Sequence, residues 1–311
     1  MYDVVIIGGG VTGFASAMYS GRLGMKTLVI GETFGGTIIL TDTVENYPGF
    51  KKITGQELAD KLKEHALDYK DFVEIKEKRV TKIEKTGDNG CFNVFMGEEQ
   101  VQGKSVIFAT GTKHRELKVP GHDEYKNKGV HYCALCDGFF YKDKKVAVIG
   151  GSDSAVKEAL VLAQHAEKVY IIYRKEKVRA EPVNLKRMQN QPKIEVINNT
   201  NVTEIKGDDK GVTQVILDKP YNGSNELKLD GVFVAIGHIP LSELAKDVGV
   251  ELNEKNEIKI NRKSETNVQG FYAAGDITDT HFKQAIIGVA EGVMAAYSAY
   301  EYINSTEIVC K

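Results

Sequence analysis

The sequence predicts an α/β fold built around two copies of one unit. Each copy has an apolar run typical of a buried strand, a glycine-rich turn, a helix-compatible segment and a second apolar run. The first copy starts at residue 4 and the second at residue 146, an offset of 142 residues. The chain has 311 residues, which is enough for two domains with separate cores.

Composition narrows the class of protein. Hydrophobic residues make up 42% and charged residues 27%, as in ordinary globular proteins. A net charge of −2 gives no reason to expect nucleic acid or membrane as a partner. Four cysteines do not form a secreted disulfide framework, so we expect a cytoplasmic protein. The uncharged stretch 4–21 carries glycines at positions 8, 9, 10 and 13 and follows no cationic leader, so we do not expect it to be a signal or membrane segment.

The first glycine turn has the spacing of a dinucleotide-binding fingerprint. Gly8 makes the turn, Gly10 lets the backbone approach a pyrophosphate, and Gly13 lets the helix pack closely on the strand. The pyrophosphate then meets the unpaired N–H groups at the start of the helix. Gly31 and Glu32 follow the second strand, where the carboxylate of Glu32 can accept hydrogen bonds from a ribose.

The second turn has the same form with two departures. Its residues are Gly150, Gly151, Ser152, Asp153, Ser154 and Ala155. Ser152 replaces the middle glycine, and its Cβ is expected to crowd the pyrophosphate; Ala155 replaces the third glycine. The cations Arg174, Lys175 and Arg179 follow the second strand and suit a 2′-phosphate, which favours NADPH over NADH. Alternatively, Lys175 and Arg179 are simply part of a solvated charged surface.

Cys133 and Cys136 form a CxxC pair that ends 14 residues before Gly150. Such a pair can close and reopen a disulfide, so it stores two electrons. Beside a dinucleotide fingerprint, it suggests electron transfer between a cofactor and a thiol substrate. A structural zinc would need four ligands, and Cys91 and Cys310 are isolated in the sequence with no matching pair, so we expect no metal. Cys91 reads as a small apolar strand residue, and Cys310 as part of a frayed tail.

Further motifs match one family along essentially the whole chain. They are Gly35-Gly36-Thr37, the segment 44–49 with Asn46, Ala109-Thr110-Gly111, the segment 133–138, Ala235-Ile236-Gly237-His238-Ile239-Pro240, Ala273-Ala274-Gly275-Asp276 and Lys283-Gln284-Ala285. Together with the two fingerprints, they make the chain resemble the low-molecular-weight thioredoxin reductases of bacteria and archaea. A CxxC-Asp-Gly segment just before the second fingerprint is the most specific part of this resemblance.

The resemblance implies two Rossmann-like domains, an NADPH domain inserted into a discontinuous FAD domain. The FAD domain would span 1–115 and 243–311, and the NADPH domain with the CxxC pair 116–242. Hinges would lie at 119–121 and 237–240. The implied FAD ligands are Gly8, Gly10, Gly13, Gly31, Glu32, Gly35, Gly36, Thr37, Asn46, Asp276, Lys283, Gln284 and Ala285, although Asp276 alone also reads as a helix cap. A homodimer is expected by resemblance only.

The resemblance also implies a mechanism. NADPH reduces FAD, the flavin opens the Cys133–Cys136 disulfide, and the dithiol reduces thioredoxin or a glutaredoxin-like small protein. Cys136 would face the flavin, Cys133 would attack the partner, and Asp137 would be the acid that protonates the leaving thiolate. Asp137 also reads as a simple turn residue before Gly138.

Several alternatives stay open at this point. Two departures from the family pattern leave room for ferredoxin or another electron donor. They are Ser152, in place of a glycine, and Tyr173, where the family usually has histidine. The same motifs would also fit a non-catalytic NADPH or redox sensor that changes its affinity for a partner with the state of its disulfide. The native acceptor protein and the roles of Cys91 and Cys310 are also undecided.

Overall fold

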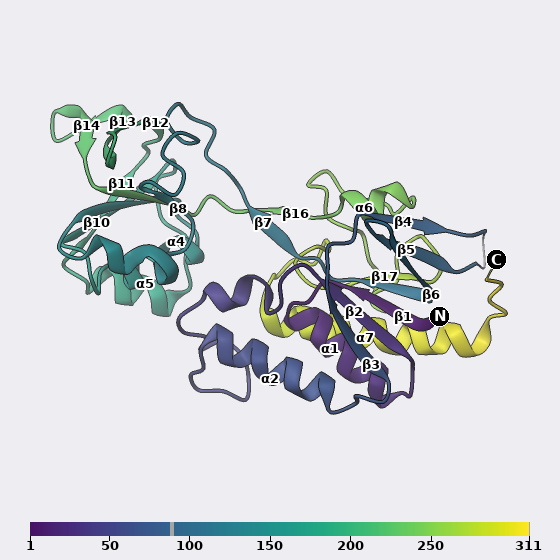
Figure 1. Ribbon diagram of the computed structural model, residues 1–311. Coiled ribbons are helices and arrows are strands. Elements are labelled where there is room, and N and C mark those ends of the chain that lie inside the picture. The colour runs from purple at the N-terminus through teal and green to yellow at the C-terminus, as the bar shows by residue number, and fades with distance from the viewer. Residues whose placement is uncertain (88–89, 311) are drawn as a thin grey trace. The chain divides into compact units, whose positions relative to one another are not determined.

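A computed structural model describes residues 1–87 and 90–310 of the chain. The chain forms two compact units (Figure 1). Unit 1 comprises Met1–Lys113 and Ile239–Lys311, and unit 2 comprises His114–His238, which interrupts unit 1 in the sequence. The sequence predicts domain boundaries after residues 115 and 242, and the two units divide after residues 113 and 238.

Unit 1 is built on a mixed sheet with the strand order β3-β2-β1-β6-β5-β4, in which β17 also pairs with β6. The strands are β1 (Tyr2–Ile7), β2 (Thr27–Gly31), β3 (Val73–Glu77), β4 (Lys82–Lys85), β5 (Phe92–Met96), β6 (Glu99–Phe108) and β17 (Phe271–Ala273). The helices are α1 (Val11–Arg22), η1 (Gly36–Leu40), α2 (Gly55–Leu67), α6 (Glu243–Asp247) and α7 (Ala285–Ser305). The pairs β1–β2, β1–β6 and β6–β17 are parallel, so their carboxyl ends meet at one edge of the sheet.

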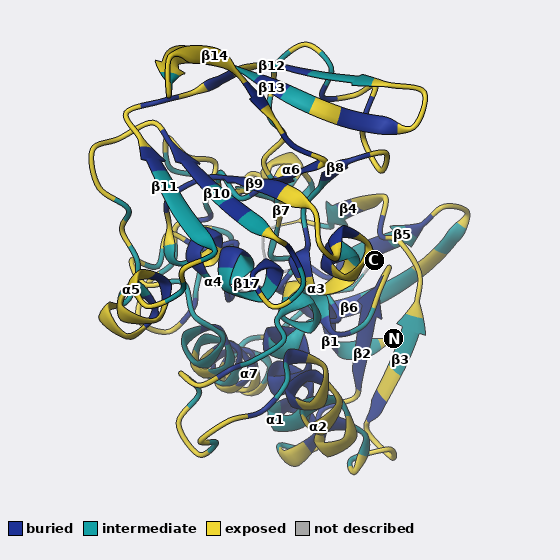
Figure 2. Ribbon diagram, turned by 90° about the vertical axis from the view of Figure 1, so that its left-hand side faces the viewer, coloured by how far each residue is buried: buried dark blue, intermediate teal, exposed yellow. Residues whose placement is uncertain are grey.

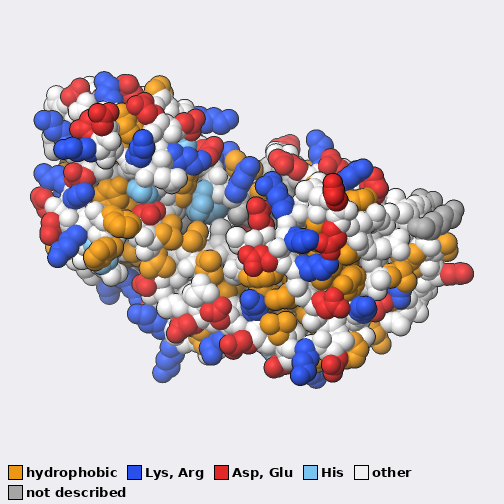
Figure 3. All heavy atoms as spheres, in the orientation of Figure 1, with side chains coloured by type: hydrophobic (Ala, Val, Ile, Leu, Met, Phe, Trp, Pro, Cys, Tyr) orange, Lys and Arg blue, Asp and Glu red, His pale blue; other side chains and the backbone are white. Residues whose placement is uncertain are grey.

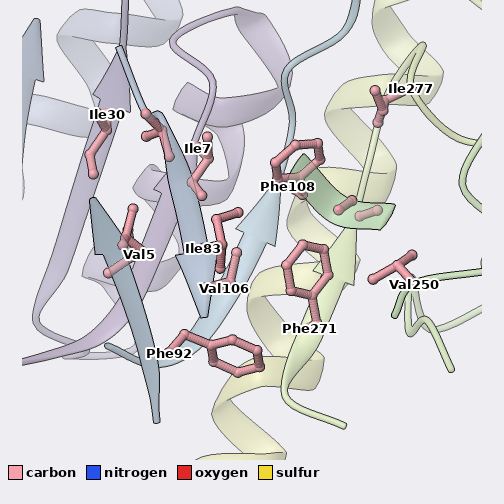
Figure 4. Packing of buried hydrophobic residues seen from close by; sticks show 14 of the residues in the cluster. Val5, Ile7, Ile30, Ile83, Phe92, Val106, Phe108, Val250, Phe271 and Ile277 are labelled. Carbon is pink, nitrogen blue, oxygen red and sulfur yellow. The ribbon is translucent and has the colours of Figure 1, made fainter. Parts of the chain in front are cut away.

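Buried apolar side chains pack on both faces of this sheet and stabilise it. The last four residues of β1 are buried, as their continuous apolar run predicts for a parallel strand covered on both faces. One cluster gathers the rings of Phe92, Phe108 and Phe271, with Phe271 centroids 5.8 Å from Phe92 and 5.7 Å from Phe108 (Figure 4). Helix α1 is mostly buried, whereas α2 exposes its outer surface (Figure 2).

Unit 2 contains a second parallel sheet, with the order β11-β10-β9-β15-β8, and an antiparallel sheet β12-β13-β14. Its strands are β8 (Val130–His131), β9 (Lys145–Ile149), β10 (Lys168–Tyr173), β11 (Ile194–Asn198), β12 (Val202–Asp208), β13 (Gly211–Tyr221), β14 (Ser224–Lys228) and β15 (Gly231–Val234). Its helices are α3 (Ala134–Asp137), η2 (Gly138–Tyr141), α4 (Asp153–Leu162) and α5 (Pro182–Gln189). The strand–turn–helix–strand order predicted for residues 146–172 is confirmed as β9, α4 and β10.

The two connections between the units pair with each other. Strand β7 (Thr112–His114) lies on the first connection and β16 (His238–Pro240) on the second, and they form a two-stranded sheet. The expected hinge at 237–240 therefore coincides with one connection, while the hinge at 119–121 lies beyond the other. Hinge motion stays a prediction. None of the helices within the described residues is long and apolar enough to cross a membrane.

Candidate active site

The first glycine turn joins β1 to α1, and neighbouring backbone leaves no room for side chains there. Gly8 has a φ of 125°, and a Cβ at this position would lie 2.1 Å from the carbonyl oxygen of Ala109. A Cβ on Gly13 would lie 1.9 Å from the carbonyl oxygen of Gly8. These contacts keep the turn tight, and α1 begins at Gly10 without a side-chain cap, which suits pyrophosphate binding.

Other predicted FAD ligands come together around this turn. Gly10 caps α1 and forms a bridge with Gly35, whose N–H donates to the carbonyl of Gly9 at 2.8 Å. Gly31 ends β2, and Gly36 and Thr37 begin η1. Glu32, the expected ribose ligand, is well exposed and lies 3.8 Å from Arg79. The fold therefore gathers backbone groups at one edge of the sheet of unit 1.

The C-terminal segment adds a second part of the same unit. The amide of Asn46 donates to Gln284 Oε1 at 2.9 Å, and Gln284 caps α7, which starts at Ala285. Lys283 donates to the carbonyl of Asp276 at 3.0 Å and pairs with Glu257 at 3.0 Å. These bonds hold Asp276, Lys283 and Gln284 in one segment; their contact with FAD stays a prediction.

Sequence reasoning missed Glu291, which fixes the loop after β17. Its carboxylate accepts from the N–H of Gly275 at 2.8 Å and from the hydroxyls of Thr278 and Thr280. Glu291 lies within α7, 15 residues beyond Asp276, and no motif marks it. It is a positioning residue for the loop that carries Asp276.

The second glycine turn joins β9 to α4 in unit 2. Gly150 has a φ of 144°, and a Cβ there would lie 2.2 Å from the carbonyl of Ala235. A Cβ on Gly151 would lie 2.4 Å from the ring of Tyr173, so the buried tyrosine at the end of β10 requires a glycine opposite it. Ser152 is exposed, caps α4 and has an extended backbone with a φ of −86°, which any residue adopts.

The polar residues of this turn have different partners. Asp153 accepts from the N–H of Glu181 and the amide of Asn184, both at 2.9 Å, so its carboxylate fastens α4 to the start of α5. Hydrogen bonding to these groups lowers the pKa of Asp153 although burial opposes the shift. Ser154 is exposed. The sequence did not predict this structural role of Asp153.

The cations expected at the NADPH site lie after β10. Arg174 and Lys175 are exposed, and the N–H of Arg179 donates to the carbonyl of Gly151 at 2.7 Å. This backbone bond brings the 174–179 segment against the glycine turn. Their role as 2′-phosphate ligands stays a prediction.

The CxxC pair lies at the start of α3 in the same unit. Cys133 and Cys136 form a disulfide with their Cα atoms 5.4 Å apart. Cys133 is 6% exposed and caps the helix, where its Sγ accepts from the N–H of Cys136 at 3.1 Å. Cys136 is exposed. A sulfur at a helix N-terminus is stabilised as a thiolate by such N–H groups.

Asp137 is held by a half-buried histidine, His131, that the sequence did not assign to the site. Nδ1 of His131 lies 3.1 Å from the carboxylate of Asp137, and Nε2 lies 2.7 Å from the hydroxyl of Tyr141. Burial lowers the pKa of His131, although the nearby Asp137 opposes this shift. Burial raises the pKa of Tyr141 to about 12, with Asp137 and Asp230 adding to the effect. Asp137 is therefore part of a hydrogen-bonded network rather than a free turn residue.

A second carboxyl group lies against the CxxC turn from α4. The N–H of Ala134 donates to Oε2 of Glu158. Burial raises the pKa of Glu158 to about 7, the hydrogen bond from Ala134 opposes the shift, and Asp137 adds to it. Sequence reasoning missed Glu158 because only tertiary packing brings it to the cysteines.

Large apolar side chains are exposed around the disulfide. Leu135 is 41%, Phe139 67% and Phe140 70% exposed. We call these three residues the apolar patch. Figure 3 shows hydrophobic side chains gathered on the visible surface of unit 2. Exposed aromatic residues beside a reactive disulfide are typical of a protein-docking surface.

The expectation that Cys91 and Cys310 are isolated was wrong. They form a second disulfide with their Cα atoms 5.0 Å apart, although 219 residues separate them in sequence. Cys91 is fully buried next to β5, and a bridge between Gly90 and Val309 lays the C-terminal segment beside it. Neither composition nor spacing could reveal this pairing, because it depends on where the chain returns after α7.

The chain is similar to known proteins along almost its whole length. A family model described as pyridine nucleotide-disulphide oxidoreductase matches residues 2–292. Thioredoxin reductase of Mycolicibacterium smegmatis is 40% identical over 308 residues and 97% of each chain. The crystal structure of Lactococcus lactis thioredoxin reductase in its FR conformation is 38% identical, with a TM-score of 0.93 over 98% of this chain and 100% of that one. That of T. acidophilum thioredoxin reductase is 37% identical, with a TM-score of 0.89 over 96% of this chain and 98% of that one.

The fold, two glycine fingerprints and a CxxC disulfide define a pyridine nucleotide-disulphide oxidoreductase. Within that class, the chain belongs to the thioredoxin reductases. The predicted family and the predicted fold class of two Rossmann-type domains are thereby confirmed.

Proposed function

We propose that this chain passes electrons from NADPH, through FAD and the Cys133–Cys136 disulfide, to thioredoxin. The observation that carries the proposal is the placement of this disulfide in unit 2, at the start of α3, which packs on α4 directly behind the second glycine fingerprint. The membership in the thioredoxin reductases supports thioredoxin as the acceptor and FAD and NADPH as the cofactors.

The residues present fit both cofactors. In unit 1, the backbone around Gly8, Gly10 and Gly35 carries no side chains where α1 begins, and no side chain caps that helix, which suits a pyrophosphate. In unit 2, Gly150 and the start of α4 would hold the pyrophosphate of NADPH, and the cations at 174–179 its 2′-phosphate. When bound, FAD supplies hydride acceptance from NADPH and two-electron reduction of the disulfide.

The cysteines and Asp137 perform the remaining chemistry. In the dithiol form, the Cys133 thiolate attacks one sulfur of the partner disulfide, forming a mixed disulfide and releasing a partner thiolate, which takes a proton. The Cys136 thiolate then attacks Cys133, which restores the enzyme disulfide and releases the second partner thiol. Asp137 is the proposed proton donor, and His131 keeps its carboxyl group oriented.

The apolar patch provides the proposed docking surface for thioredoxin. Leu135 lies between the cysteines, and Phe139 and Phe140 lie directly after α3, so a partner that covers them brings its disulfide to Cys133 and Cys136. Exposed phenylalanine side chains supply apolar contact area to such an interface.

We also propose a cytoplasmic homodimer. A thiol–disulfide cycle driven by NADPH fits a reducing compartment. Light scattering coupled to gel filtration tests the dimer, and a monomeric mass in the presence of FAD would contradict it.

The test is an anaerobic titration of FAD-loaded protein with NADPH and, in parallel, NADH. NADPH is expected to bleach the flavin and then yield two thiols from the Cys133–Cys136 disulfide. Cys133→Ser should abolish thioredoxin turnover, whereas Cys310→Ser, a matched change in the other disulfide, should keep it. A flavin that stays oxidised with NADPH but is reduced by ferredoxin would support the alternative donor instead.

A further inference from the structure

Glu158 and Cys133 both accept hydrogen bonds from the same short turn. The N–H of Ala134 donates to Oε2 of Glu158, and the N–H of Cys136 donates to Sγ of Cys133 at 3.1 Å. Ala134 and Cys136 are residues of α3, and Glu158 lies in the second turn of α4, which packs on α3. One backbone turn thus connects a carboxylate to the sulfur that is proposed to attack the partner.

Two negative charges at this turn would oppose each other. Opening the disulfide creates a thiolate at Cys133, and an ionised Glu158 would place a like charge a few atoms away. A like charge in a partly buried setting disfavours ionisation of its neighbour. The raised pKa of Glu158, near 7, means that its charge changes within the working pH range.

The other charged groups near Glu158 do not neutralise it. Asp137, on α3, has the same sign of charge and is held by His131 at 3.1 Å. The lysines on β9, α4 and β10 pair with other carboxylates: Lys145 with Glu167, Lys157 with Asp153, and Lys168 with Glu195. The remaining charged or titratable groups on neighbouring elements are Lys186 and Arg187 on α5 and Tyr141 on η2. Asp137 is the charged side chain that acts on the pKa of Glu158, and it raises this pKa in addition to burial.

We propose that Glu158 is a positioning residue that holds the CxxC turn through Ala134 and, by its charge, controls how readily the Cys133 thiol ionises. This inference rests on the proposed role of Cys133 as the attacking thiol. Neutral Glu158 leaves the N–H groups of α3 to stabilise the thiolate. Ionised Glu158 raises the pKa of Cys133, so reduction of the partner becomes coupled to the proton on Glu158.

The experiment measures the ionisation of Cys133 directly. FAD-loaded enzyme is reduced with a phosphine, alkylated with iodoacetamide between pH 5 and 9, and the modified cysteine is located by fragment mass spectrometry. Glu158→Gln keeps an acceptor for Ala134 but removes the charge, so the midpoint of the Cys133 alkylation profile is expected to fall by about one pH unit. Glu167→Gln removes a well-exposed carboxylate of the same unit and should leave the midpoint unchanged.

Further variants separate charge from packing. Glu158→Asp retains the charge and should keep a midpoint near that of the unsubstituted enzyme. An unchanged midpoint in Glu158→Gln, or an equal fall in Glu158→Asp, would overturn the proposal. The alkylation profile does not require turnover, so it tests the role of Glu158 separately from the proposed function. The proposed function would be contradicted by a different result, namely that Cys133→Ser still reduces thioredoxin.

Discussion

Gly13 offers a sharp test of the first fingerprint, because the second copy has Ala155 at the equivalent position. A Cβ on Gly13 would lie 1.9 Å from the carbonyl oxygen of Gly8, well inside van der Waals contact. Gly8 cannot yield easily, since its N–H donates to Ile30 at 2.8 Å and its Cα faces Ala109. In the second copy, the Cβ of Ala155 is accommodated, fully buried beside Gly150.

Gly13→Ala should therefore displace α1 from β1. Overpacking of this kind costs about 1–3 kcal/mol. For a unit of this size, that corresponds to a fall in the unfolding midpoint of roughly 2–4 °C per kcal/mol. Because the start of α1 also moves, we expect the protein to be purified with a lower FAD content.

Differential scanning fluorimetry and the ratio of flavin to protein absorbance measure both effects. Ala155→Gly is the matched control, and it should cost only about 0.5–1 kcal/mol, the usual penalty for glycine in a helix, with normal flavin content. A Gly13→Ala protein with full flavin and an unchanged midpoint would refute the close packing described for this turn.

Four further outcomes follow from the site. Phe140→Ser should raise the KM for thioredoxin by about tenfold while the rate of flavin reduction by NADPH stays the same, and a parallel loss of both would argue against docking at the apolar patch. Arg174→Ala should raise the KM for NADPH by about tenfold or more and leave the KM for NADH unchanged in steady-state assays. Cys310→Ser should lower the unfolding midpoint by an amount equivalent to about 2–4 kcal/mol without reductant, and this difference should vanish with dithiothreitol. The pKa of Glu158 is raised to about 7 in the folded state, so protonated Glu158 stabilises the fold at low pH. This contribution to the free energy of unfolding is lost as the pH rises from about 4.5 through 7. Relative to Glu158→Gln, unfolding curves of the unsubstituted protein should show a loss of up to about 3 kcal/mol in the free energy of unfolding over this range.

The sequence could predict those parts of the site that depend on local spacing. The strands 4–7 and 146–149, their glycine turns and the CxxC pair follow from periodicity and from the chemistry of phosphate and thiols. In contrast, Glu158 and Glu291 act through backbone groups far away in sequence, and no local pattern distinguishes them from surface carboxylates. The Cys91–Cys310 disulfide joins residues 219 positions apart, so only the three-dimensional path of the chain after α7 reveals it.

Helix α4 links the two halves of the proposed chemistry. Its N-terminus carries Ser152 and Asp153 of the second fingerprint, and its second turn places Glu158 against the CxxC turn. The carboxylate of Asp153 also fastens this helix to α5, and Arg179 binds the turn before it. A substitution that shifts α4 along its axis would therefore disturb the donor site and the disulfide together. A substitution at Glu158 alone should change the ionisation of Cys133 and leave the affinity for NADPH intact, and this separation distinguishes an electrostatic role of Glu158 from a general loss of packing.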